Sequence, residues 1–576
     1  MLLEAWESKL GQNERHWESI KAPSEDRQSL VVPHRDIWID EVTRGARAGV
    51  NSTLGPTGSR NWISELRSLA RREIAIAATA YVESYLPNFR TATGSLADDG
   101  DLQKDFCWIV GGHQPEAFHP GVWFKNFFID SMVSELSKRG RPALGLHVIV
   151  DHDLAKSTSI RVPYLEQPSS GEHPATRFRN ESLRLPLVAD RDATQAKPWH
   201  SHSVDRRELA SFAESVVVSS HTLGIEVPLA VPFCHYLKSE VDPSNAALAF
   251  SQARHRIEVE AGLRNLEIPM GTVCETKAWS LFVAHCIENS NHLHERYNRC
   301  LSAYREIYHV KNPGQPVPPL ARNQDWVELP FWFYRKADAT RNRLWVRSID
   351  GGYELGSGVG VSEFHWTLRA FGAGEELAAE FRNWFQEGVC LRPRALITTM
   401  FLRMFVADGF VHGIGGGLYD RLTDRLIESF LESSAPTYAI ATATFRLPLD
   451  EARKSEYQAI QSQQEALNRD IHNMRSRPEL FLDLTCQEHR KYLQEHQALL
   501  ADIPPRGSKR EWHIQMQSLR MRIRAEIAAA AQRLTEQQFE LQRASQQQAL
   551  LRSREFSFLL FPAERCVQQL RELAQR

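Results

Sequence analysis

Four ionisable side chains of the sequence have the types and spacing for acid–base or phosphate chemistry: His113, His119, Asp151 and Asp153. Histidines placed beside a phosphate group in transfer stabilise its developing charge. Aspartates bind Mg²⁺ or orient an amine nucleophile. We therefore take these four residues as candidate catalytic groups, and we expect that replacing His119 or Asp153 lowers turnover without unfolding the chain.

These residues follow two apolar runs, 106–110 and 143–150, with an amphipathic segment from Val122 to Leu136 between them. The pattern predicts a strand, a helix and a second strand, which together form a βαβ unit with parallel strands and a right-handed crossover. We expect Gly111 and Gly112 to end the first strand and open a loop. Ligands bind at the carboxyl ends of such strands. The free N–H groups at the start of the helix favour an anion such as phosphate.

A second strand, glycine loop and helix is expected near residue 410. An apolar run ends at His412, residues 413–417 are rich in glycine, and residues 418–430 are amphipathic. Glycines let the backbone approach a ligand closely. We therefore expect the two loops to share a crevice that binds a nucleotide or phosphate; a tight turn without a ligand is the alternative. The candidate binding residues in these segments are Gly111, Gly112, Gln114, Lys125, His152, Gly415, Gly416 and Gly417.

Two other groups of residues allow a functional interpretation and a structural one. A predicted long helix from about Lys277 to Tyr308 carries His285, Cys286, His292, His294 and Cys300, but no loop supplies ligand pairs of zinc spacing, which favours an ordinary amphipathic helix. A β-rich segment with turns at Asp338 and at 350–352 carries Glu328, Trp332 and Arg335. These three side chains could hold a substrate, although packing of the sheet is the favoured interpretation.

The C-terminal part of the chain changes to long polar helices. Apolar residues near heptad spacing, among them Leu519 and Ile523, predict a seam, and the sequence IPPRGSK at 503–509 interrupts it. We expect two long antiparallel helices that fold back at this break. Their apolar seam would continue into a homodimer contact.

Composition limits the class of protein. The 576 residues include 69 basic and 71 acidic residues and carry a formal net charge of −2, which does not suggest nucleic acid or an anionic membrane as a partner. The eight cysteines form no C-x-x-C pair, which is typical of reduced thiols. The N-terminal residues lack the apolar core of a signal peptide, and no apolar run reaches the length of a membrane span. We expect a cytoplasmic protein that acts on a small molecule.

Three segments resemble the bacillithiol-synthesis cysteine-adding enzyme family, whose members are cysteine ligases with a Rossmann-like core related to class I aminoacyl-tRNA synthetases. GGHQPEAFHPG resembles the family's Gly-Gln-Gln-Pro loop and Gly-Pro turn, and VIVDHD resembles its Glu-Asp-His-Asp strand end. LRPR and HGIGGGLYDRL resemble its Arg-Pro and Gly-Gly-Pro-Gly-Glu segments. The order along the chain and the terminal REFSFLLFP agree, so that the resemblance covers nearly the whole chain.

The resemblance implies further residues and an activity. It adds Arg392 and Arg394 of LRPR to the candidate binding residues, and it implies a reaction that joins cysteine to a glucosaminyl malate, with ATP or ADP and Mg²⁺ as possible cofactors. The chain departs from the family at His113, where the family has Gln, and at Val150, where it has Glu. Leu418 and Tyr419 replace the acidic residue after the glycines.

The resulting expectation is an α/β protein with a Rossmann-like parallel-sheet core, inserted α/β segments and a long antiparallel helical hairpin, or coiled coil. The expected parts are an N-terminal helical part of the core (1–105), a first βαβ unit (106–160), insertions and connecting segments (161–385), the second half of the core (386–449), the hairpin (450–552) and a C-terminal segment that docks on the core (553–576).

Two further functions fit the same residues. Asp151 and Asp153 also match the D-x-D metal clamp of nucleotide-sugar glycosyltransferases, with the glycine loops holding a diphosphate; a nucleotidyltransferase is a related possibility. A binding or scaffold protein without catalysis is the other alternative.

Overall fold

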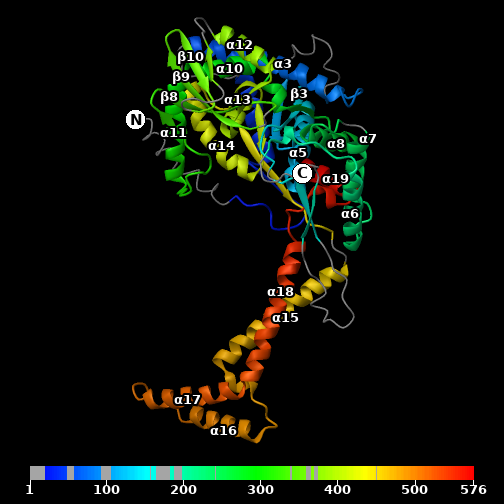
Figure 1. Cartoon of the computed structure of the whole chain (residues 1–576). Helices are drawn as coiled ribbons and strands as arrows, with labels where there is room; N and C mark the ends of the chain where they lie inside the picture. Colours follow the sequence, from blue (N-terminus) through cyan, green and yellow to red (C-terminus); the bar gives the residue numbers. More distant parts are fainter. Residues whose placement is uncertain are drawn as a thin grey trace.

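The computed structural model describes residues 20–48, 57–92, 106–155, 157–163, 182–186, 197–239, 242–337, 340–358, 365–368, 374–448 and 451–576. The expected turn at Asp338 lies outside the described residues. The described part of the chain is a mixed α/β body with a helical arm extending from it (Figure 1).

A six-stranded sheet forms the centre of the body. Its order is β1(Gln28–Val32), β14(Tyr438–Thr444), β13(Gly409–His412), β2(Cys107–His113), β3(Ala143–Ile149) and β6(Leu266–Pro269). All neighbouring pairs are parallel except β1 with β14, which is antiparallel. The predicted parallel βαβ unit is thus confirmed in β2, α5(Pro120–Lys138) and β3.

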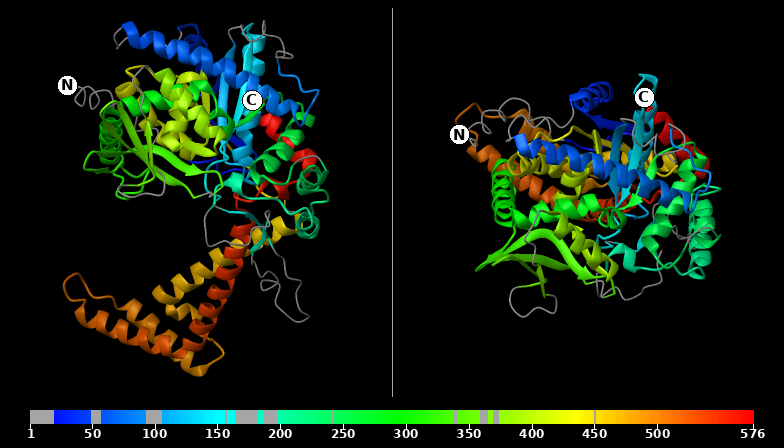
Figure 2. Two further views of the ribbon diagram at one scale, coloured as in Figure 1. Left: turned by 45° about the horizontal axis from the view of Figure 1, so that its top comes forward. Right: turned by 90° about the horizontal axis from the view of Figure 1, so that it is seen from above.

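The sheet is buried on both faces because its strands alternate between two hydrophobic cores. Trp108 and Val110 of β2 belong to one core, whereas Cys107 and Ile109 belong to the other. This alternation follows from the two-residue period of a strand. The helix α5 packs against β2, β3 and β14, and α3(Thr57–Glu83) packs against β6 (Figure 2).

The two glycines of the first site-like segment are part of the strand, contrary to the predicted loop. β2 continues to His113, and Gly111 and Gly112 pair with His147 and Val148 of β3. A side chain on Gly111 would lie 2.8 Å from Ile129 of α5, and one on Gly112 would lie 2.7 Å from the Val148 carbonyl oxygen. These glycines therefore permit close packing of helix and strands, and they do not form a phosphate loop.

A second sheet lies beside the first. Its order is β11(His365–Leu368), β10(Gly352–Gly356), β9(Asn342–Ile349), β8(Trp326–Arg335) and β12(Val389–Pro393), with β7(Arg322–Asn323) also paired to β8. The predicted strands and the turn before β10 are confirmed, and Gly351 has the positive φ of +78° that such a turn requires. Residues 389–393 belong to this sheet, although they were expected in the second half of the core.

Helices connect and cover the sheets. The predicted long helix is broken after Glu288 into α10(Lys277–Glu288) and α11(Ser290–Ile307). The remaining helices of the body are α2(Arg35–Ala48), α6(Glu208–Thr222), α7(Ala230–Ser239), α8(Ala246–Glu260), α9(Met270–Val273), α12(Gly374–Gln386), α13(Ala395–Phe405), α14(Ile414–Leu426) and α19(Ala563–Gln575). The segment before α19 contacts the body, since Phe558 N donates to Phe118 O at 2.8 Å.

The arm consists of α15(Glu451–Ser476), α16(Gln487–Ala501), α17(Arg510–Glu526) and α18(Ala528–Leu551). α15 lies along α18 next to the body, and α16 lies along α17 at the far end (Figure 1). The predicted break at 503–509 is the turn between α16 and α17, where Gly507 has a φ of +105°. The two expected long helices are therefore two successive helix pairs.

The apolar seam of the arm is used within the arm itself. Leu519 and Ile523 are fully buried in a small core with Met474, Leu482 and Ile527. Leu519 and Ile523 are therefore covered within the arm itself, and continuation of the seam into a dimer contact stays a prediction. Among the described residues, no helix is long and apolar enough to cross a membrane.

Candidate functional site

Two neighbouring strand ends bring the first candidate residues together. His113 and Gln114 end β2, and Asp151, His152 and Asp153 follow β3, its parallel neighbour. Val150 N donates to His113 O at 3.0 Å, and Gln114 Nε2 donates to Asp153 Oδ2 at 2.9 Å. Candidates from both strand ends thus share the carboxyl edge of the first sheet.

Asp153 connects this edge to the second sheet. Its Oδ1 lies 3.1 Å from Arg341 Nη1, and the guanidinium of Arg341 lies 4.4 Å from the ring centroid of Trp332. Burial alone would raise the pKa of Asp153, but the hydrogen bond from Gln114 and the charges of His152 and Arg341 together hold it below its usual value. Asp153 is therefore ionised at neutral pH, and it is held on two sides.

Asp151 is a buried carboxylate that organises the surrounding backbone. Its Oδ1 accepts a hydrogen bond from Gly271 N at 2.9 Å, and its main-chain oxygen accepts one from His200 Nδ1 at 3.2 Å. Burial would raise the pKa of Asp151, but His152, His200 and Arg392 lower it on balance. A side chain at Gly271 would lie 2.7 Å from Asp151 Oδ2, so that this close approach requires glycine. Asp151 therefore holds the start of α9 against the end of β3.

His152 is buried, and it joins the edge to the Arg392–Arg394 segment. Its Nε2 donates to the carbonyl oxygen of Pro393 at 3.1 Å. Its Nδ1 lies 3.8 Å from Asp151 Oδ1. The segments VIVDHD and LRPR, far apart in the sequence, are therefore in direct contact.

Arg392 and Arg394 have different surroundings. Arg394 Nη1 lies 2.5 Å from Oε1 of the fully buried Glu328, and its guanidinium lies over the Trp332 ring. Arg392 is also buried, but its ion pair with the exposed Glu275 is 3.6 Å long, and the charge of Asp151 also acts on it. Glu328 thus has a structural role as a buried counter-ion, whereas Arg392 is weakly neutralised.

His119 caps the helix that it precedes. Its Nδ1 accepts a hydrogen bond from Gly121 N at 3.1 Å, and its Nε2 lies 3.7 Å from Glu555 Oε2 in the C-terminal segment. Burial, with smaller contributions from the charges of Arg554 and Lys125, lowers the pKa of His119 to about 3. The histidine is therefore neutral, and its contacts are with α5 and the C-terminal segment, whereas those of Gln114 and Asp153 reach the second sheet.

Lys125 lies inside the body behind the strand end. It is 3% exposed, and its Nζ donates to Gly112 O at 3.0 Å. Burial lowers the pKa of Lys125 to about 7, with a smaller contribution from Arg254. This lysine fixes the end of β2, and its amine loses its charge more readily than an exposed one.

The second glycine segment is the first turn of a helix. Gly413 is the N-cap of α14, and Gly415, Gly416 and Gly417 lie within the helix, contrary to the predicted loop. A side chain at Gly417 would collide with Ile440, whereas Gly413 and Gly415 have open space around them. β13 is the parallel neighbour of β2, so that this helix start lies at the same sheet edge as His113.

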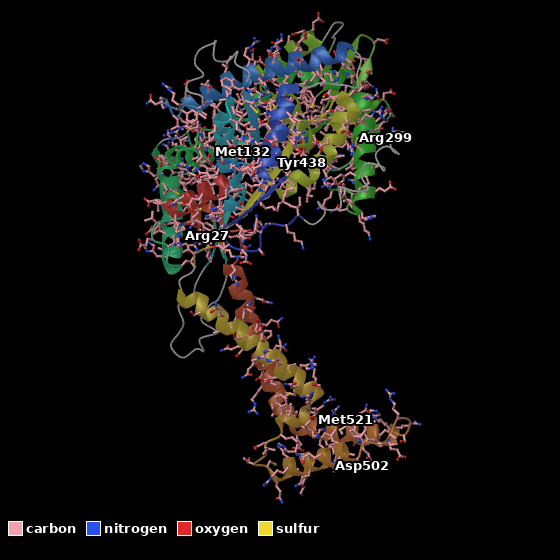
Figure 3. The ribbon with its side chains drawn as sticks, turned by 180° about the vertical axis from the view of Figure 1, so that it is seen from behind. Arg27, Met132, Arg299, Tyr438, Asp502 and Met521 are labelled. Carbon is pink, nitrogen blue, oxygen red and sulfur yellow. The ribbon has the colours of Figure 1, made fainter. Side chains whose placement is uncertain are left out.

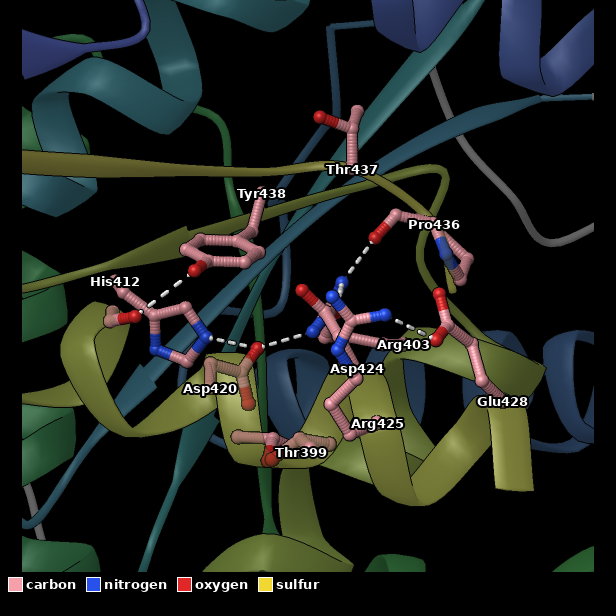
Figure 4. Close-up of polar contacts among 12 residues, drawn as sticks. Thr399, Arg403, His412, Asp420, Asp424, Arg425, Glu428, Pro436, Thr437 and Tyr438 are labelled. Carbon is pink, nitrogen blue, oxygen red and sulfur yellow. Dashed lines mark hydrogen bonds and ion pairs between the residues drawn. The ribbon is translucent and has the colours of Figure 1, made fainter. Parts of the chain in front are cut away.

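A buried ionic cluster next to α14 was not predicted from the sequence (Figure 4). His412 Nε2 lies 2.8 Å from Asp420 Oδ2, and Arg403 Nη1 lies 2.5 Å from the same oxygen. Arg403 Nη2 also lies 2.7 Å from Asp424 Oδ1, and the guanidinium lies over the Tyr438 ring. The acidic pair in LYDRLTD was the only sequence signal, because Arg403 reaches it from α13.

The histidines of the α10–α11 region pack against aromatic rings. The His285 ring packs against Trp62 with a centroid distance of 4.3 Å, and His292 packs near Phe430. Within the described ranges, no group of three or more His, Cys, Asp or Glu side chains could hold a metal ion. No known family model matches the chain, and no curated protein matches it.

Proposed function

We propose that this protein is a ligase of the bacillithiol-synthesis cysteine-adding type, which joins cysteine or another amino compound to a small sugar-linked acceptor. One observation carries the proposal: the residues that resemble the family's three separate motifs meet at one sheet edge. Gln114 contacts Asp153, and His152 contacts Pro393. The start of α14 follows the strand next to β2.

The order of the parallel strands supports a Rossmann-like core. Numbered along the chain, the strands β2, β3, β6, β13 and β14 take the spatial order 3-2-1-4-5. The order reverses between β2 and β13, and ligands of such sheets bind at this reversal, beyond the carboxyl ends of the strands. His113 and Gly413 flank this place.

The residues present fit a nucleotide in part. The open backbone of Gly413 and Gly415 at the start of α14 suits a phosphate, whereas the packed Gly111 and Gly112 do not. ATP with Mg²⁺ would supply an activated phosphate. Asp153 is the partly exposed carboxylate that would face the cation or an amine.

The D-x-D glycosyltransferase alternative has less support. In a metal clamp both carboxylates would face one cation. Here Asp151 accepts a hydrogen bond from Gly271, whereas Asp153 is held by Gln114 and Arg341. The two carboxylates therefore bind different partners, which does not match a clamp on one cation.

A homodimer through the arm stays a prediction. Ile514, Met521 and Phe539 are exposed apolar side chains of the arm, with exposed fractions of 58%, 62% and 71%. Met521 lies on the far part of the arm, remote from Tyr438 in the body (Figure 3). A dimer contact would use such residues.

Mass spectrometry of the purified protein with ATP, Mg²⁺, cysteine and glucosaminyl malate tests the reaction. We expect a condensation product that the Asp153→Asn variant forms more slowly. Asp325→Asn, which changes an exposed carboxylate in the turn between β7 and β8, is the matched control. Hydrolysis of a sugar nucleotide without any amine would favour the glycosyltransferase, and no nucleotide binding would favour the scaffold.

A further inference from the structure

A group of buried polar atoms without partners lies where the second sheet meets the strand edge. In the register of β8 and β12, Cys390 pairs with Tyr334 and Arg392 pairs with Trp332. Paired residues and residues two positions apart share a face of a sheet. Arg392 and Tyr334 therefore project from the same face, opposite to Phe333 and Leu391, which belong to the hydrophobic core.

Three atoms of this group have no hydrogen-bond partner among the described residues: Arg392 Nη1, the Tyr334 hydroxyl and His200 Nε2. The His200 ring stacks on the Tyr334 ring, with a centroid distance of 6.1 Å and an interplanar angle of 12°. The charge of Arg392 acts on the pKa of both Tyr334 and His200. The three side chains are thus neighbours.

The cation of the group lacks a short ion pair. Arg394 and Arg403 each have a carboxylate at 2.5 Å, but Arg392 has Glu275 at 3.6 Å, and Glu275 is exposed. Burial raises the pKa of the Cys274 and Cys390 thiols near Arg392, so that neither supplies a negative charge. The charge of Asp151 also acts on Arg392, since it raises the pKa of the guanidinium. Arg392 Nη1 nevertheless has no hydrogen-bond acceptor among the described residues, and a buried donor without an acceptor is unfavourable. An anion beside Arg392 would supply that acceptor.

The hydrogen-bonding pattern defines the kind of anion. Arg392 Nη1 and the Tyr334 hydroxyl can donate to oxyanion oxygens. His200 Nδ1 faces the carbonyl oxygen of Asp151, which can only accept, so that the proton of the neutral ring lies on Nδ1. Burial lowers the pKa of His200, which keeps the ring neutral and makes Nε2 an acceptor. The site therefore offers two donors and one acceptor.

We propose that Arg392, Tyr334 and His200 form a subsite for an oxyanion that carries its own hydrogen-bond donor, such as a hydrogen phosphate or an α-hydroxy- or α-amino-carboxylate. The inference rests on the proposed function, because it takes this anion to be one end of that enzyme's substrate. Arg392 and Tyr334 bind the oxygens, and His200 accepts the donor hydrogen.

Calorimetric titration of the full-length protein at neutral pH and constant ionic strength tests the subsite with two matched pairs of anions. Phosphate carries a hydroxyl that sulfate lacks, and lactate carries one that propionate lacks. We expect phosphate to bind better than sulfate, lactate better than propionate, or both. The pair that shows the preference identifies the phosphate or the carboxylate source. Equal binding within each pair, or no binding of any of the four, would overturn the proposal.

Variants assign the binding to these residues. Tyr334→Phe removes one hydroxyl that has no partner in the described chain, so that folding is retained, and it should weaken the preferred anion roughly tenfold. Tyr304→Phe is the control, since the Tyr304 hydroxyl bonds to Leu418 O elsewhere. His200→Phe keeps an aromatic ring beside Tyr334 but removes both ring nitrogens, so that it should abolish the preference for the hydroxyl-bearing anion. Unchanged affinity in Tyr334→Phe would place the anion elsewhere.

The anion-binding subsite and the proposed ligase activity can fail independently of each other. Selective anion binding that depends on Tyr334, without any condensation product, would reject the ligase and keep the subsite. A condensation product with the same rate in the wild-type protein and in Tyr334→Phe, without selective anion binding, would keep the ligase and reject the subsite.

Discussion

Gln114 Nε2 donates to Asp153 Oδ2 at 2.9 Å and so joins the ends of two adjacent parallel strands. The hydrogen bond links the first candidate motif to the second. It also contributes to the low pKa of Asp153, against the effect of burial. Substitution of Gln114 therefore tests whether the ionised carboxylate of Asp153 stabilises this edge of the sheet.

Gln114→Glu should disturb this edge by placing two carboxylates together. The pKa of Asp153 lies below its usual value, so that its contribution to stability is present above pH 4 and is lost as the pH falls. In the variant, repulsion raises that pKa, and the loss should begin at a higher pH. Thermal melts between pH 3 and 7 measure this, with Gln114→Met as the uncharged control. Identical acid limbs for Gln114→Glu and Gln114→Met would contradict the role of the pair.

Asp420→Asn and Asp424→Asn should differ in their effect on stability, although both carboxylates contact Arg403. Arg403 and His412 hold the pKa of Asp420 well below its usual value against the effect of burial, whereas burial raises the pKa of Asp424 to about 6. Breaking the buried Asp420 pair should cost about 3–5 kcal/mol of unfolding free energy. Asp424→Asn should be near neutral at pH 7, because the fold disfavours that charge. Denaturant unfolding of both variants at pH 7 checks the contrast, and equal losses would contradict it.

His119 should contribute to acid sensitivity. Its pKa is about 3 in the folded chain and near 6.5 when unfolded, so that the unfolded state binds the proton between these values. Stability should therefore fall as the pH decreases from 6.5 towards 3. His119→Asn keeps a side-chain acceptor for the helix and removes the titration, so its acid limb should be shallower.

His119→Ala separates the capping role from the titration. The variant loses the cap and should lose about 1 kcal/mol at pH 7. The expectation that this variant stays folded is kept, with a measurable loss of stability from the missing cap. Thermal melts at pH 5 and 7 for both variants are the measurement. A steep acid limb in His119→Asn would show that other groups control it.

The arm should depend on its own core. Leu519 is fully buried and Ile514 is 58% exposed on the same helix. Leu519→Ala should destabilise the arm by about 2–5 kcal/mol, whereas Ile514→Ala should change it by less than about 0.5 kcal/mol. Hydrogen exchange followed by mass spectrometry would show faster exchange in residues 487–526 of the Leu519 variant only. Equal exchange in both variants would contradict the buried role.

A substitution of an exposed side chain, rather than of a buried one such as Leu519, tests whether the arm forms a dimer contact. Met521→Glu should leave the arm folded, because the side chain is already in solvent. If the protein is a dimer through this face, light scattering should show a dimer for the wild type and a monomer for Met521→Glu. A monomeric wild-type protein would reject the dimer.

The sequence predicted the parallel unit because apolar runs and their spacing are local signals. It also predicted the break between α16 and α17, since IPPRGSK cannot continue a helix. The glycines were assigned wrongly, because a glycine that admits a neighbouring element and a glycine that opens a loop look alike in sequence. Gly111 is required by Ile129 on the following helix, and Gly417 by Ile440 on the next strand.

Candidate residues next to strand ends were placed correctly at one edge, whereas the second sheet's contribution was not predictable. Arg341 and Tyr334 reach the edge from an insertion whose docking is set by tertiary packing. Arg403 is similar, because its carboxylates lie on another helix. Contacts of this kind join residues far apart in the sequence, so that no local sequence pattern identifies them.

The proposal that the three motifs form a ligase site can be checked by product analysis with mass spectrometry. With ATP, Mg²⁺, cysteine and glucosaminyl malate, and then with other amino acids and acceptors, we expect a condensation product whose rate of formation falls in Asp153→Asn. Absence of nucleotide binding and of any condensation product across that panel would contradict it.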